Sequence, residues 1–193
     1  MARPKAYIRE QVIDTATRVF WSQGFKGTSV SDLVAKTGLN KHSLYQEFGS
    51  KEGLFRECLE NFAHKMNREP VLILNREPLG LANIKTFFQN RIEYAASSSS
   101  FGCLLVNTLI EKELVDAAAF DKARGYLHKV EDCFYRCLEA ARQSGELEAK
   151  QDCRVIARFL LNTLVGMMVL SKSGPAKDEL EAMVAVALAS LTG

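Results

Sequence analysis

The 193-residue sequence predicts an all-α protein, in which a small N-terminal helical unit precedes a bundle of long amphipathic helices. Three observations predict this fold class. Nearly every segment carries apolar residues at the spacing of one helix face. The breaks between these segments contain Gly, Pro or Ser, which end helices. One short apolar run, VLIL at 71–74, could form a strand, but no second strand is available to pair with it.

The N-terminal unit contains three short predicted helices. The first ends at Gly24 and the second at Gly38, while the third begins near Asn40, whose side chain can cap it. The apolar stripes are Ile8, Val12, Ala16, Val19 and Phe20, then Val30, Leu33 and Val34, then Leu44, Tyr45 and Phe48. Residues 1–50 therefore form one predicted domain.

A longer helix follows, capped by Ser50, and residues 51–78 are predicted to connect it to the body. The apolar face of this helix consists of Leu54, Phe55, Leu59, Phe62 and Met66. The VLIL run is interpreted as the frayed end of the helix and a connector. Within a third region, 79–193, further helices are predicted near 81–96, 101–117, 118–144, 152–172 and 177–191.

Composition excludes several classes of protein. The sequence contains no run of about 18 apolar residues, so no membrane span is predicted. The charged N-terminus lacks the apolar core of an export signal, so export is not expected. Five scattered cysteines fit reduced thiols in a cytoplasmic protein. Cys133 and Cys137 share a helix face but have no His or third Cys close in sequence, so neither a metal nor a cofactor is expected. No catalytic motif is present, and no catalytic residue is assigned.

Positive charge is concentrated at the start of the chain. Residues 1–51 contain eight Lys or Arg against four Asp or Glu, whereas the remainder contains 17 against 19. This imbalance favours a polyanionic partner for the N-terminal unit.

The stretch VSDLVAKTGLNKHSLY (30–45) has the features of a helix-turn-helix. Gly38 suits the turn, and Val34 and Leu44 fall where residues must wedge the two helices together. This arrangement leaves a face of Lys41, His42, Tyr45 and Gln46, whose side chains can contact phosphates and base edges. The alternative is an ordinary polar surface helix that happens to contain a tyrosine.

Residues 20–55 closely resemble the N-terminal domain of TetR/AcrR-type bacterial transcriptional regulators. The matching positions, in order, are Gly24, Phe25, Thr28 and Ser29, then Val34, Ala35 and Gly38, then Ser43, Leu44, Tyr45 and Phe48, then Ser50, Lys51, Glu52 and Leu54. The resemblance implies a recognition helix over 40–46. It further implies base contacts by Lys41, His42 and Tyr45 and phosphate contacts by Thr28, Ser43 and Lys51. Alternatively, Thr28 only caps its helix, Lys51 only solvates the surface, and Tyr45 half-packs on the first helix.

The resemblance also implies a homodimer on a palindromic operator, since one short recognition helix gives too little specific affinity. The predicted function is a repressor that a small-molecule effector or thiol modification releases from DNA. The helices 118–144 and 152–172 are candidates for the dimer interface, and the alternative is that their apolar stripes form an ordinary intramolecular core, as part of each stripe must. Their stripes are Leu127, Val130, Phe134, Leu138 and Ala141, and Val155, Phe159, Leu160, Thr163, Leu164 and Met167. An all-helical enzyme and a non-specific architectural DNA-binding protein are the alternatives.

An effector pocket is implied by the same resemblance and would be apolar with a few polar groups. Its candidate residues are Phe87, Phe88, Arg91, Tyr94, Phe101, Cys103, Leu105, Asn107, Asn162, Met167 and Met168, although such residues also form ordinary cores. Cys103 is expected at the third position of a helix capped by Ser100, where the helix dipole lowers the pKa of a thiol. Otherwise it is simply a small buried apolar residue.

Glu47 lies close to the predicted DNA-binding face although DNA would repel it. Two residues beyond Tyr45, it points about 200° around the helix from that side chain. We therefore expect Glu47 to face the first helix or solvent and to pair with Arg18.

Overall fold

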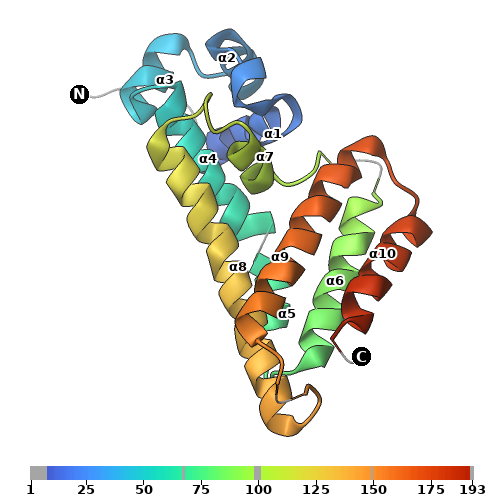
Figure 1. Cartoon of the computed structure of the whole chain (residues 1–193). Helices are drawn as coiled ribbons and strands as arrows, with labels where there is room; N and C mark the ends of the chain where they lie inside the picture. Colours follow the sequence, from blue (N-terminus) through green and yellow to red (C-terminus); the bar gives the residue numbers. More distant parts are fainter. Residues whose placement is uncertain (1–7, 67, 98–100, 149, 192–193) are drawn as a thin grey trace.

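The computed structural model describes residues 8–66, 68–97, 101–148 and 150–191, and within these ranges every regular element is helical. The all-α prediction is confirmed. The N-terminal helices are α1 (Arg9–Gly27), α2 (Val30–Thr37), α3 (Lys41–Phe48) and α4 (Lys51–Met66). The body contains α5 (Arg68–Leu74), α6 (Leu81–Ala95), α7 (Leu104–Ile110), α8 (Ala117–Ser144), α9 (Cys153–Leu170), the 3₁₀ turn η1 (Ser171–Ser173) and α10 (Lys177–Ala189). Figure 1 shows α1–α3 gathered at one end of the molecule and the long helices extending away from them.

The helix-turn-helix is built by local caps around a small apolar core. Ser29 begins α2 with a reciprocal capping box to Asp32, and Gly38 ends it in the left-handed conformation at φ 71°. The side chain of Asn40 accepts a hydrogen bond from the Ser43 amide (2.8 Å) and starts α3. The buried wedge consists of Leu33, Leu39 and Leu44. Val34, predicted as part of the wedge, is only half-buried because it lies one position around the helix from Leu33.

The first helix does not stop at Gly24 as predicted. The backbone there turns to φ 74° and ψ 171°, and α1 resumes for a short segment to Gly27. A positive φ of this kind favours glycine, because it has no Cβ. The break leaves the amide of Phe25 outside the regular hydrogen-bond ladder of the helix.

Helix α4 joins the N-terminal unit to the body, packing against α1 along most of its length and also against α8 (Figure 1). The VLIL connector was wrongly predicted, because residues 68–74 form the separate helix α5. Pro70 is compatible with its first turn, where the missing amide hydrogen is not needed, and Leu74 is fully buried. The side chain of Met66, like Ser100, lies outside the described residues.

The body is a bundle in which α8 supplies much of the core. Every residue of its predicted interface stripe, from Leu127 to Ala141, is buried within this chain, so this stripe is core and not a dimer surface. The helix predicted over 101–117 is much shorter. Helix α7 ends at Ile110, a turn follows, and the Asp116 side chain accepts the Ala119 amide (2.7 Å) to start α8.

Helix α9 has an inner and an outer apolar face. Leu160, Leu164 and Met167 are buried, whereas Val155 and Phe159 are 64% and 44% exposed. The segment Cys153–Ser173 is long and apolar enough to span a membrane by length and composition, but its inner face packs on α8. Exposed apolar residues continue along the outer surface at Val169 and Leu170, and at Val186 of α10.

Candidate DNA-binding surface and effector cavity

Helix α3 presents a polar outer face at the end of the molecule. Lys41, His42 and Tyr45 are exposed, with Tyr45 at 40%, while Leu44 between them is fully buried. The Lys41 ammonium lies 6.0 Å from the centroid of the Tyr45 ring. Ser43, in the first turn, is partly exposed. The four side chains can therefore meet a nucleic acid together, with the amide groups of the α3 N-terminus beside them.

The two other predicted phosphate contacts have structural roles in this conformation. Thr28 is fully buried, and its hydroxyl donates to the carbonyl of Gly24 (2.8 Å), so this side chain is not available to a phosphate. The Lys51 ammonium donates to the carbonyls of Phe25 and Thr28, both at 2.9 Å, and lies 4.0 Å from the centroid of the Phe25 ring. Lys51 thus closes the end of α1, where carbonyls lack helical partners.

Glu47 faces the first helix, but its partner there is not Arg18. Its carboxylate accepts a hydrogen bond from Arg9 Nε (3.0 Å), and the same guanidinium contacts Glu57 (3.0 Å). Arg9 also lies 5.3 Å from the ring centroid of Phe48. The hydrogen bonds that Arg9 donates to Glu57 and to Glu47 raise the pKa of Arg9, against the effect of burial. Glu47 therefore fixes α3 to α1 and leaves the outer face free of negative charge.

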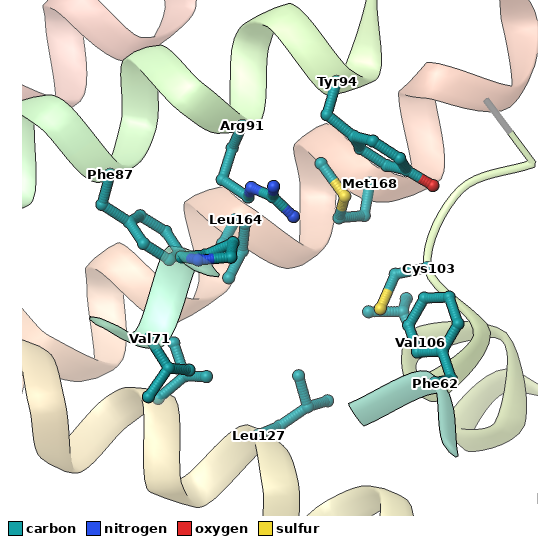
Figure 2. Close-up of a pocket in the computed structure, with 12 residues that line it drawn as sticks. Phe62, Val71, Phe87, Arg91, Tyr94, Cys103, Val106, Leu127, Leu164 and Met168 are labelled. Carbon is teal, nitrogen blue, oxygen red and sulfur yellow. The ribbon is translucent and has the colours of Figure 1, made fainter. Parts of the chain in front are cut away.

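A cavity of about 30 Å³ lies inside the body, which is room for roughly one or two waters. It is bordered by Phe62, Pro70, Val71, Phe87, Arg91, Tyr94, Cys103, Val106, Leu127, Val130, Leu164 and Met168. Five predicted pocket residues, Phe87, Arg91, Tyr94, Cys103 and Met168, are brought together here (Figure 2). Among the other bordering residues, Leu127, Val130 and Leu164 belong to the stripes assigned to the dimer interface, and Phe62 belongs to the predicted apolar face of α4. Pro70 and Val71 lie in the misassigned connector, and no sequence pattern marked Val106.

Six predicted pocket residues lie elsewhere, and two of them, Phe88 and Leu105, are buried without bordering the cavity. Phe101, in the segment before α7, is 45% exposed and its ring packs edge-on against Trp21, while Asn162 is exposed on α9. Asn107 is buried, but its amide donates to the carbonyl of Phe101 (3.3 Å) away from the cavity. Met167 is fully buried yet borders no part of the cavity, because it lies one position around α9 from Met168. Helical periodicity alone does not distinguish these neighbouring directions.

Cys103 differs from the expectation in both position and ionisation. It is the N-cap residue of α7, not its third residue, and its side chain is buried. Burial raises the pKa of the Cys103 thiol, although the amides of Val106 and Leu105 and the charge of Arg91 oppose this. The helix N-terminus does act in the predicted direction, but desolvation is the larger effect. The resting thiol is therefore protonated at neutral pH.

Two contacts tie the segment around Cys103 to the N-terminal unit. Trp21 of α1 donates its indole N–H to the carbonyl of Gly102 (3.1 Å), which also accepts the hydroxyl of Tyr94 (2.9 Å). At the other end of α7, the Glu111 carboxylate accepts the free amide of Phe25 (2.9 Å). No sequence pattern marks either contact, because each joins residues more than 80 positions apart.

Two family models together match most of the chain. Residues 12–58 match bacterial regulatory proteins of the tetR family, and residues 80–189 match the tetracyclin repressor-like C-terminal domain. The HTH-type transcriptional repressor ComR of Escherichia coli (strain K12) is 29% identical over 182 residues, covering 92% of this chain and 86% of ComR. BdcR, an HTH-type transcriptional repressor from the same strain, is 25% identical over 96% of this chain and 89% of its own.

The fold is shared with solved structures. A cysteine mutant of the TetR family transcriptional regulator CifR, complexed with 26 bp double-strand operator DNA, has a TM-score of 0.86 and 27% identity, covering 97% of this chain and 99% of its own. Escherichia coli NemR in its reduced form has a TM-score of 0.81 at 20% identity, covering 93% and 94%.

Proposed function

The chain belongs to the tetR family of bacterial regulatory proteins, and we propose that it is a homodimeric repressor whose operator affinity is controlled from the cavity beside Cys103. It is a DNA-binding transcriptional regulator and not an enzyme. The observation that carries the proposal is the outer face of α3, where Lys41, His42 and Tyr45 are exposed over a fully buried Leu44. The CifR relative, bound to operator DNA, supports DNA as the partner.

Within this face the side chains have different expected roles. Lys41, His42 and Tyr45 can reach base edges, while Ser43 suits a phosphate. The Lys51 ammonium already donates to the carbonyls of Phe25 and Thr28. It can contact a phosphate with its remaining N–H group, or after giving up one of these two bonds. Loss of a base-reading side chain should relax sequence preference, and loss of a phosphate contact should weaken binding to all sequences about equally.

The exposed apolar surface of α9 and α10 supports a homodimer. Val155, Phe159, Val169 and Leu170 of α9 and Val186 of α10 are each at least 41% exposed. An apolar surface of this kind is typical of a protein interface. We assign the interface to the outer faces of α9 and α10, in place of the α8 stripe, which is buried. A twofold pairing there would give two copies of α3 for successive half-sites of a palindrome.

Control of DNA binding needs a physical connection between the cavity and α3. Helix α7 has Cys103 at its start and Glu111 just after its end, and both neighbourhoods contact α1 through Trp21 and Phe25. Helix α1 in turn holds α3 through the Arg9–Glu47 pair. A ligand that displaces Tyr94 or Cys103 would disturb Gly102 and shift α1, so that the two recognition helices no longer match the operator.

Thiol modification would act at the same place. The buried, protonated Cys103 should react slowly, and an adduct would not fit a cavity of about 30 Å³. Modification should therefore force the segment around Gly102 apart. In this proposal a non-covalent effector and an adduct both widen one cavity.

The test is fluorescence anisotropy with labelled DNA from upstream of the protein's own gene, before and after treatment with N-ethylmaleimide. We expect the treated wild type to lose about 10-fold in affinity, within the usual range of coupling between two sites. Cys103→Ser should bind the DNA but not respond, and Cys153→Ser serves as the matched control. Equal release of wild type and Cys103→Ser would contradict thiol control at Cys103.

A further inference from the structure

The cavity contains one permanently charged group, the guanidinium of Arg91. Figure 2 shows this side chain reaching from α6 into the space that Phe87, Leu164 and Met168 border. Apart from Tyr94 and Cys103, the other bordering side chains are apolar. An apolar core needs no such charge, so its presence calls for a specific explanation.

The partners of Arg91 do not neutralise it. Its Nε and Nη2 both donate to a single oxygen, Oδ1 of the neighbouring Asn90, at 3.1 and 2.6 Å. Its guanidinium carbon lies 5.1 Å from the ring centroid of Tyr94. Among the described residues, no carboxylate lies within 4.0 Å of it, and Glu69 acts only at longer range. The arginines that do pair with a carboxylate are Arg9, Arg56, Arg124, Arg142, Arg154 and Arg158.

The Cys103 thiol does not supply the missing negative charge. Burial dominates its ionisation and keeps it protonated at neutral pH, even with Arg91 nearby. Burial also lowers the pKa of Arg91, opposed by Cys103, Tyr94 and Glu69, but a guanidinium remains charged at any physiological pH. The free protein therefore holds a partly desolvated cation with most of its five N–H donors directed at no acid among the described residues.

We propose that the cavity binds an organic anion, with a carboxylate paired to Arg91 and a compact apolar or aromatic body against Phe87, Leu164 and Met168. This inference rests on the proposed role of the cavity as the effector site. A carboxylate matches the fork of a guanidinium with two parallel hydrogen bonds, which are strong where water is excluded. The apolar lining contributes affinity, and the single cation selects the charge of the ligand.

A neighbouring cleft offers one route by which such a ligand can enter. Phe62 and Tyr94 border both the cavity and an open cleft of about 540 Å³ lined by α1, α4 and α6. A ligand passing from the cleft to Arg91 must displace these two rings. Because the Tyr94 hydroxyl shares the Gly102 carbonyl with Trp21, entry disturbs the contact that ties α1 to the body.

The experiment titrates the dimer with acetate, butyrate, octanoate and benzoate, each matched with its neutral amide. Binding is followed by thermal shift and by the fluorescence of Trp21, the single tryptophan of the chain. At least one carboxylate should bind 10-fold or more tightly than its amide. Arg91→Met should abolish this preference, Arg91→Lys should keep part of it, and Lys85→Met, on the exposed face of the same helix, should leave it unchanged.

A second readout separates ligand binding from a structural role. If Arg91 serves a ligand, the free Arg91→Met protein should melt at the same temperature as wild type or higher. Arg91→Gln is measured beside Arg91→Met, so that one poorly tolerated side chain does not decide the result. A fall of several degrees in both variants, no carboxylate preferred over its amide, or a preference that survives in either variant would overturn the proposal. Operator binding by the unliganded wild type is measured in the same samples, so the failure of this inference is distinguishable from failure of the proposed function.

Discussion

Glu111→Ala should uncouple the cavity from the DNA-binding unit. The carboxylate accepts the amide of Phe25 at 2.9 Å, just after the break in α1 at Gly24. A hydrogen bond to a charged group stabilises a protein by about 1.5–3 kcal/mol, and the half-buried position of Glu111 favours the lower end of this range. At about 2–4 °C per kcal/mol for a chain of this size, the variant should melt about 3–8 °C below wild type.

The functional effect is measured by operator anisotropy with and without N-ethylmaleimide. Wild type should lose about 10-fold in affinity on modification of Cys103, whereas Glu111→Ala should change by about 2-fold or less. Glu113→Ala removes the same charge from an exposed position two residues away and should behave as wild type. Coupling through Glu111 is refuted if Glu111→Ala has the same melting temperature as wild type, or if its operator affinity still falls about 10-fold on treatment with N-ethylmaleimide.

Three further predictions concern the dimer, α3 and the buried thiols. Phe159→Glu should yield a monomer by light scattering and lower operator affinity about 100-fold or more through lost bivalency, while Leu72→Glu, at an exposed apolar position on α5, should do neither. Glu47→Ala removes the partner of Arg9 and should cost about 0.5–1 kcal/mol of folding stability with operator affinity nearly unchanged. An unchanged melting temperature with strongly altered affinity would contradict that placement. Burial raises the pKa of Cys58 to about 12 in the folded protein. The buried thiol therefore contributes its full folding stability at a pH below the pKa of the thiol in the unfolded chain, and this stability is lost as the pH rises from there toward the folded pKa. Denaturant titrations measure the free energy of unfolding at each pH. Above about pH 9, this free energy should fall by about 1.4 kcal/mol less per pH unit in Cys58→Ala than in wild type. Equal pH dependence in the two proteins would refute this.

Local sequence signals predicted the N-terminal unit well. Gly38 and Asn40 act on their own neighbours, so the turn and the cap of α3 could be derived from the residues alone. The direction of Glu47 followed from helix geometry, but its partner did not. Which arginine of α1 meets it depends on the crossing of two helices, and the structure selects Arg9 over Arg18.

The cavity and its connections were harder to predict because they depend on packing between distant segments. Met167 and Met168 are both buried, yet only Met168 borders the cavity. Cys103 was correctly predicted near the start of a helix, although it is the N-cap residue and not the third residue. Its burial could not be predicted from the sequence, and the resulting desolvation raises the pKa of the thiol where a lowered pKa was expected. The Trp21–Gly102 contact arises only when α1 packs on the start of α7.

Selective operator binding by two α3 helices is tested most directly by comparing affinity for upstream DNA and for random DNA at physiological salt. Wild type should bind the upstream palindrome at least about 10³-fold more tightly than random DNA, as one dimer per site. Tyr45→Ala should lose most of that ratio. Equal affinity of the wild type for the two DNAs would contradict sequence-specific regulation by this protein.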